Sequence, residues 1–152
     1  MAADVQATGF KTVAPSLDGT IARTAALAAL RRAAGPARWL TGASGTGKST
    51  LVASHVRDAA PSAWYRLDAR DDDPAFFYAN FGAALERAWP QAADLPTFVD
   101  DDRAAEDAFA ERYFAAVASR CGRGTFVLDN AHVLAREPMQ RALTRTARAA
   151  AA

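Results

Sequence analysis

A glycine-rich stretch in the first third of the chain has the residue types and the spacing for binding phosphate. It follows the pattern G-x-x-x-x-G-K-[ST], and the residues of the expected site are Gly42, Ala43, Ser44, Gly45, Thr46, Gly47, Lys48, Ser49 and Thr50. Glycines let consecutive backbone N–H groups turn inward around phosphate oxygens, because a Cβ would block the backbone angles or the close approach. Lys48 adds a compact positive charge at the β- and γ-phosphates, and Ser49 offers a hydroxyl to Mg²⁺. The pattern therefore predicts a nucleoside triphosphate site; the alternative is a glycine-rich turn without a ligand.

Such a loop needs a strand before it and a helix after it, and the flanking sequence supplies both. Residues 38–41 predict the strand, and apolar spacing predicts a helix from about residue 47 to residue 59. A helix that begins at the loop directs the positive end of its dipole at the same anion.

Helices and strands are expected to alternate along the rest of the chain. A helix is predicted over residues 21–30, and strands over residues 63–68 and 125–129. Asp73 is expected to cap a helix that has Pro74 at its first position. Another helix is predicted over residues 104–120, and Glu137-Pro138 should open a last one. Residues expected to face inward from these helices are Phe77, Phe81, Leu85, Phe109, Tyr113, Val117, Met139 and Leu143.

This alternation predicts an α/β fold, in which a mostly parallel sheet has helices on both faces and binds ligands at the carboxyl ends of its strands. Asp129 ends the apolar run of the third strand. We therefore expect Asp129 to hold Mg²⁺ together with Ser49.

Composition limits the class of protein. The chain has 152 residues, 51% of them hydrophobic, and a formal net charge of +1, which fits one globular domain. This composition indicates neither a membrane nor a polyanion as a partner. Neither a signal-like start nor a membrane-length apolar run is evident, so we expect a cytoplasmic protein. Cys121 is the single cysteine, which excludes an intramolecular disulfide and a thiolate metal cluster.

Further motifs around the second and third strands narrow the interpretation. A segment of the form W-x-x-L-D is followed by D-x-D-P-x-x-F, and the third strand is followed by D-N-x-H. The residues concerned are Trp64, Leu67, Asp68, Asp71, Asp73, Pro74, Phe77, Asp129, Asn130 and His132. Upstream, Ile21-Ala22-Arg23 is similar to an h-G-R element that contacts nucleotide in related ATPases. On these motifs the chain resembles the nucleotide-binding domain of STAND-class P-loop ATPases, and most closely the MalT-like, LuxR-type ATP-dependent bacterial transcription regulators.

The resemblance implies a fold and a domain organisation. The fold would be an AAA+/STAND-like P-loop NTPase, with residues 1–19 as an N-terminal extension and residues 20–152 as the nucleotide-binding domain. In the family the strand order is 5-1-4-3-2. The chain would thus be truncated after the third strand and its helix, and would lack the fourth and fifth strands and the helical lid.

The resemblance also implies cofactors and partners. ATP or ADP would bind with Mg²⁺, and Arg23 would contact the nucleotide. The partners would be the C-terminal domains of a longer protein, DNA only through regions not in this chain, and other copies through ATP-dependent self-association.

Asn130 departs from the family pattern, which has a second carboxylate at this position. A neutral amide can orient the attacking water but cannot take its proton, so Asn130 as the catalytic-position residue predicts slow hydrolysis or none. The expected function is accordingly an ATP-dependent switch in a signalling or transcription regulator. The alternative for Asn130 is that it caps the following helix.

Two other functions stay open. One is a P-loop enzyme such as a small-metabolite kinase or a transporter ATPase. Against a transporter ATPase, no L-S-G-G-Q signature lies between the loop and Asp129, and against a kinase, no Arg-rich lid follows the third strand. The other is a non-functional fragment of a larger ATPase. His55 is expected to be an ordinary helix histidine, because no second metal-ligating residue type shares its face.

Overall fold

The computed structural model describes residues 9–35, 37–58, 61–137, 140–141 and 144. The α-helices are α2 (Thr24–Arg32), α3 (Lys48–Val56), α4 (Pro74–Ala88) and α5 (Glu106–Arg120). The strands are β1 (Ser62–Arg66) and β2 (Thr125–Asp129). Short 3-10 helices connect them: η1 (Gly9–Thr12), η2 (Ala69–Asp72), η3 (Pro90–Asp94), η4 (Asp100–Ala105) and η5 (Ala131–Val133).

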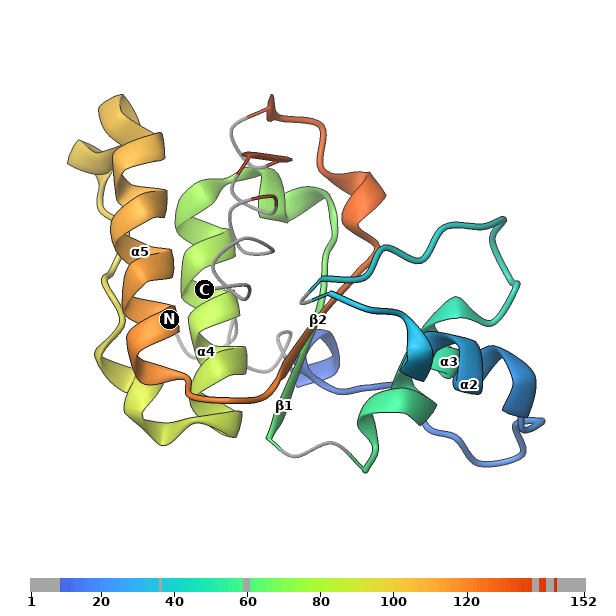
Figure 1. Cartoon of the computed structure of the whole chain (residues 1–152). Helices are drawn as coiled ribbons and strands as arrows, with labels where there is room; N and C mark the ends of the chain where they lie inside the picture. The colour runs from blue at the N-terminus through green and yellow to red at the C-terminus, as the bar shows by residue number, and fades with distance from the viewer. Residues whose placement is uncertain (1–8, 36, 59–60, 138–139, 142–143, 145–152) are drawn as a thin grey trace.

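The two strands form a parallel sheet that lies between layers of helices (Figure 1). Ser62 pairs with Thr125 and Arg66 with Asp129, so both strands end at the same edge. Side chains alternate along β1: Ala63 and Tyr65 face the cluster built with α4 and α5, whereas Trp64 packs with α3. The expected α/β class, with a parallel sheet covered on both faces, is confirmed for the described part of the chain.

An aromatic cluster fills the space between the sheet and helices α4 and α5. Phe77, Phe81 and Leu85 recur every fourth residue along α4, and each is at most 1% exposed. The rings of Phe77 and Phe81 stack with centroids 5.4 Å apart, and Tyr65 meets both from β1. Burying a side chain of this size contributes about 1.5–3 kcal/mol, so this face is the main hydrophobic core.

The start of α4 follows the prediction. The Asp73 carboxylate accepts a hydrogen bond of 2.9 Å from the backbone N–H of Ala75, and Pro74 occupies the first turn. Both features are local, which is why the sequence alone predicted them.

Between α5 and β2, Gly124 is in close contact with Trp89: an added Cβ would lie 2.1 Å from the indole ring.

Three predicted elements need comment. Residues 38–41 form no strand, because neither β1 nor β2 pairs with them, and Trp39 is 67% exposed. That prediction is wrong for the described structure. The strand predicted over residues 63–68 is β1, which runs from Ser62 to Arg66 and so begins one residue and ends two residues earlier than predicted. It ends there because η2 begins at Ala69. The inward-facing role of Met139 and Leu143 lies outside the described residues.

Among the helices of the described residues, none combines the length and the apolar character that a membrane crossing requires.

Candidate nucleotide site

The glycine-rich loop lies at the carboxyl edge of the sheet and leads into α3. Gly45 and Gly47 have φ angles of +75° and +74°, in the left-handed region that side chains disfavour. The Lys48 ammonium is held inside the loop, where Nζ donates to the carbonyl oxygens of Gly42 and Ala43 at 2.8 Å. A second contact stiffens the loop, because the Thr46 hydroxyl donates to the carbonyl of Ala43 at 2.9 Å. The loop therefore presents a cation and turned backbone at the start of a helix, where anions are favoured.

Ser49 and Asp129, which are 80 residues apart in sequence, meet at this edge. The Ser49 hydroxyl, in the first turn of α3, donates a 2.9 Å hydrogen bond to Asp129 Oδ1 at the end of β2. Arg66, the register partner of Asp129 on β1, approaches the other carboxylate oxygen at 3.4 Å. The fold thus places the two residues expected to hold Mg²⁺ in direct contact.

The chemistry of this pair fits Mg²⁺. A hydroxyl and a carboxylate are hard oxygen donors, and Mg²⁺ is usually bound by one or two such groups plus substrate phosphates and water. The described residues contain no group of three or more His, Cys, Asp or Glu side chains able to hold a metal ion. Ser49 and Asp129 would therefore hold the ion only together with a phosphate ligand.

Arg23 also reaches the loop. Its guanidinium Nη1 donates to the carbonyl of Thr46 at 2.8 Å, and it lies beside Gly47, where an added Cβ would be 3.5 Å away. Arg23 immediately precedes α2, so this contact joins α2 to the loop. The structure thus brings Arg23 to the loop, which was expected only from the h-G-R resemblance.

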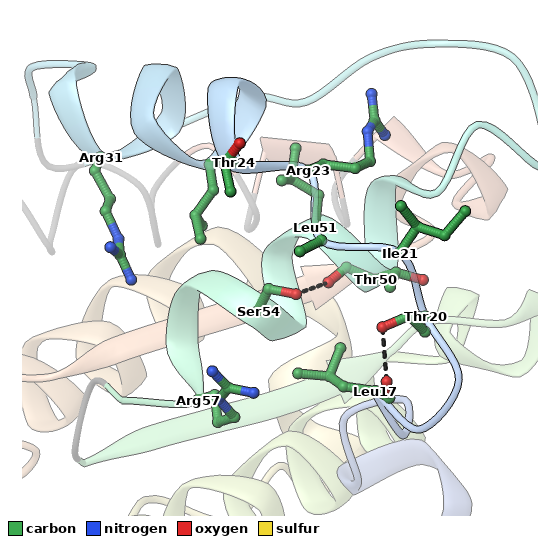
Figure 2. Close-up of a pocket in the computed structure, with 12 residues that line it drawn as sticks. Leu17, Thr20, Ile21, Arg23, Thr24, Arg31, Thr50, Leu51, Ser54 and Arg57 are labelled. Carbon is green, nitrogen blue, oxygen red and sulfur yellow. Dashed lines mark hydrogen bonds between the residues drawn. The ribbon is translucent and has the colours of Figure 1, made fainter.

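A hollow of about 220 Å³ lies next to the loop between α2 and α3 (Figure 2). Five apolar residues line it, Leu17, Ile21, Ala22, Leu27 and Leu51, together with seven polar or charged ones, Thr20, Arg23, Thr24, Arg31, Thr50, Ser54 and Arg57. Figure 2 shows Arg31 and Arg57 at the side away from Ile21. We refer to this feature as the α2–α3 hollow.

Asn130 follows Asp129 in a left-handed conformation, with φ +63° and ψ +31°. Asn is one of the few residues with a side chain that adopts this region readily. Its backbone carbonyl accepts from Val133 N at 3.0 Å, but its side chain makes no capping hydrogen bond to η5. The side-chain cap considered from the sequence is therefore not formed. Asn130 is exposed next to Asp129, and His132 is exposed as well.

Asp72, the last residue of η2, holds the loop that follows β2 and η5. Its carboxylate accepts hydrogen bonds from the backbone N–H groups of Ala135 and Arg136 at 3.0 and 3.1 Å. These contacts tie the segment after η5 to η2.

His55 stays apart from this chemistry. Burial, reinforced by the positive charges of Arg38 and Arg31, lowers the pKa of its imidazole below the usual value. Partial burial beside cations therefore favours the neutral form of this imidazole.

Sequence reasoning missed a buried ionic cluster next to the site. Lys11 is 1% exposed, and its ammonium lies 2.6 Å from Asp71 Oδ2 and 3.2 Å from Asp68 Oδ2. Asp71 is fully buried and also accepts from the Tyr65 hydroxyl at 2.5 Å and from Asp68 N at 2.7 Å. The D-x-x-D spacing of Asp68 and Asp71 signals a cap, and this cap is formed. Nothing local marks Lys11 as buried.

This cluster changes the titration of its members. Burial raises the pKa of Asp68, but hydrogen bonds from Arg70 and Lys11 outweigh it and lower the pKa from 3.8 to about 2. Burial, followed by the hydrogen bond to Asp71, raises the pKa of Tyr65 above its usual value. Tyr65 therefore stays a neutral donor and Asp68 a charged acceptor at neutral pH.

Comparison with known proteins gives no significant match to a protein-family model, a curated protein or a solved structure. The functional argument therefore depends on the geometry of the site.

Proposed function

We propose that the chain is the ATP-binding switch domain of a bacterial signalling or transcription regulator, and that it binds ATP or ADP with Mg²⁺ and hydrolyses slowly. The observation that supports this most is the 2.9 Å hydrogen bond between Ser49 and Asp129. A phosphate-binding loop pattern can occur by chance in a turn. In a chance turn, however, the serine of the pattern would not be expected to contact an aspartate at the end of a strand.

Each part of the site then has a role. The loop from Gly42 to Thr50 surrounds the phosphates, and Lys48 exchanges its carbonyl partners for phosphate oxygens. Ser49 and Asp129 hold Mg²⁺, which neutralises charge on the phosphates when bound. The α2–α3 hollow takes the nucleoside part, and Arg23 links the wall of the hollow to the loop.

Asn130 favours a switch over fast turnover. It presents an exposed amide where related ATPases have a carboxylate, so it can orient a water but cannot accept its proton. Information would then come from which nucleotide is bound, since a γ-phosphate adds contacts that ADP lacks. The remaining proposals follow from the family resemblance: a cytoplasmic location, further domains in a longer protein, DNA binding only through such regions, and ATP-dependent self-association.

The test is whether Mg²⁺ strengthens nucleotide binding through the Ser49–Asp129 pair. ATP affinity of the 152-residue chain should be measured with Mg²⁺ and with EDTA, for wild type, Ser49→Ala and Asp129→Asn. Loss of a contact to a charged group costs about 1.5–3 kcal/mol, so each variant should bind MgATP roughly tenfold or more weakly. In EDTA the differences should largely disappear.

Ser62→Ala is the matched control, because Ser62 lies at the opposite end of the sheet from Asp129. It should leave both affinities unchanged. Wild-type binding that ignores Mg²⁺, or Ser49→Ala binding equal to wild type, would refute the proposed metal site.

A further inference from the structure

Lys11 has an unusual position for a residue close to the N-terminus. Its side chain is 1% exposed and is enclosed by two carboxylates and two rings, which we call the Lys11 cage: Asp68, Asp71, Tyr65 and Phe76. The ammonium lies 5.2 Å from the centroid of the Tyr65 ring and 4.8 Å from that of Phe76. Lys11 and Asp71 are both buried, whereas the Asp68 side chain is 36% exposed. A buried ion pair is stable only in good geometry, so the 2.6 Å contact with Asp71 ties Lys11 to η2.

The segment that follows Lys11 runs from the cage to the nucleotide site. Ala14 and Leu17 pack on the apolar cluster of Ala53, Val56 and Trp64, between α3 and β1. At residue 20 the chain turns, because Thr20 N and Oγ1 both donate to the Leu17 carbonyl at 3.1 and 2.7 Å. We call residues 13–23 the strap.

The second half of the strap forms part of the site itself. Leu17, Thr20, Ile21, Ala22 and Arg23 line the α2–α3 hollow, facing Leu51 and Ser54 of α3 (Figure 2). The strap ends at Arg23, whose guanidinium holds the Thr46 carbonyl in the phosphate loop. Residues 18–23 are exposed, so this half of the strap is fixed mainly by the packing of Ala14 and Leu17 before it and by the contact of Arg23 at its end.

We propose that Lys11 is a positioning residue for the nucleotide site: its cage anchors the strap, and the anchored strap holds the wall of the hollow and Arg23 against the phosphate loop. The predicted effect on nucleotide release rests on the proposed function. The anchoring of the strap by Lys11 does not depend on that function. Without the anchor, the strap loses its fixed end and the nucleotide dissociates faster, although no loop residue has changed.

The experiment follows hydrogen exchange and nucleotide release in the 152-residue chain. In Lys11→Met, exchange of backbone amides in the strap should rise in the nucleotide-free protein, while exchange in α5 stays the same. Release of a fluorescent ADP analogue should become about tenfold faster, as expected if the charged contact of Arg23 is no longer held in place. Arg23→Ala should cause a similar acceleration.

A double variant separates positioning from general destabilisation. If Lys11 acts through the strap and Arg23, Lys11→Met combined with Arg23→Ala should release nucleotide no faster than the quicker single variant. Tyr113→Phe is the control for stability: it removes a buried 3.2 Å hydrogen bond to the Tyr78 carbonyl in the α4–α5 core, away from the strap. It should lower thermal stability without changing release.

Each outcome decides a separate point. Unchanged strap exchange in Lys11→Met, or fully multiplicative effects in the double variant, would overturn the anchor. If wild type binds no nucleotide, the proposed function fails, and the exchange measurement still decides whether Lys11 anchors the strap. Should Lys11→Met not fold, Asp68→Asn removes one carboxylate of the cage, keeps Asp71, and is expected to raise strap exchange in the same region.

Discussion

Replacing Gly45 with alanine should weaken nucleotide binding by an amount that follows from the loop geometry. Gly45 has a φ of +75°, and a Cβ built there meets no atom within 4 Å. The cost of Gly45→Ala is therefore torsional and not steric. A left-handed conformation costs a residue with a Cβ about 1–2 kcal/mol. Because the loop is exposed at this point, alanine can relax it when no nucleotide is bound. Binding must then restore the strained angle, and affinity should fall by roughly 5- to 30-fold.

The torsional cost can lower either the nucleotide affinity or the stability of the free protein. Calorimetric titration with MgADP measures the first, and a thermal melt of each variant measures the second. We expect the affinity loss in Gly45→Ala with little change in melting temperature. Gly122→Ala is the control, because Gly122 also has open space around its Cβ position but lies after α5, at the other end of β2. It should leave affinity unchanged. If Gly45→Ala has wild-type affinity and wild-type stability, the loop does not need the conformation assigned to it.

Three other outcomes are expected. Asn130→Asp should raise ATP turnover while nucleotide affinity stays similar, because it supplies the missing carboxylate; a wild-type rate already in the range of about 1–100 per second would contradict the switch. Since the pKa of Asp68 is lowered from 3.8 to about 2, its contribution to stability is complete above about pH 4 and is lost as the pH falls toward 2. Asp68→Asn should flatten this part of the stability curve measured by urea unfolding, and an unchanged curve would argue against the cage. Finally, because the described sheet has two strands and residues 38–41 pair with neither, the 152-residue chain should be marginally stable and prone to aggregate. A sharp, reversible melt of a monomer that binds ATP tightly would contradict that expectation.

Features set by local sequence were predicted well. The helix start at Asp73-Pro74 depends on residues one or two positions apart, and β2 was predicted with its observed bounds because its apolar run is short and clearly delimited. The buried face of α4 follows from the helical spacing of Phe77 and Phe81. In each case the determining interactions lie within one element or between one element and the core.

Features set by tertiary contacts were predicted less well. Residues 38–41 have a sequence suited to a strand, but a strand needs a partner, and none of the described residues supplies one. Lys11 is charged and would be expected in solvent, yet it is buried because it pairs with Asp71 on η2, which also accepts a hydrogen bond from Tyr65 on β1. The contact between Ser49 and Asp129 was expected from paired motifs, since no local pattern connects residues so far apart.

Direct titration of nucleotide into the folded chain tests the central claim. Isothermal calorimetry with MgATP should show saturable binding by wild type, and Lys48→Ala should bind roughly tenfold or more weakly, because it loses a charge-assisted contact worth about 1.5–3 kcal/mol. Lys48 lies inside the loop, held by two carbonyl oxygens that phosphate would replace, so its removal acts on the phosphate site and not on the core. Equal affinity in wild type and Lys48→Ala, with both proteins folded by circular dichroism, would show that the loop does not bind the phosphates.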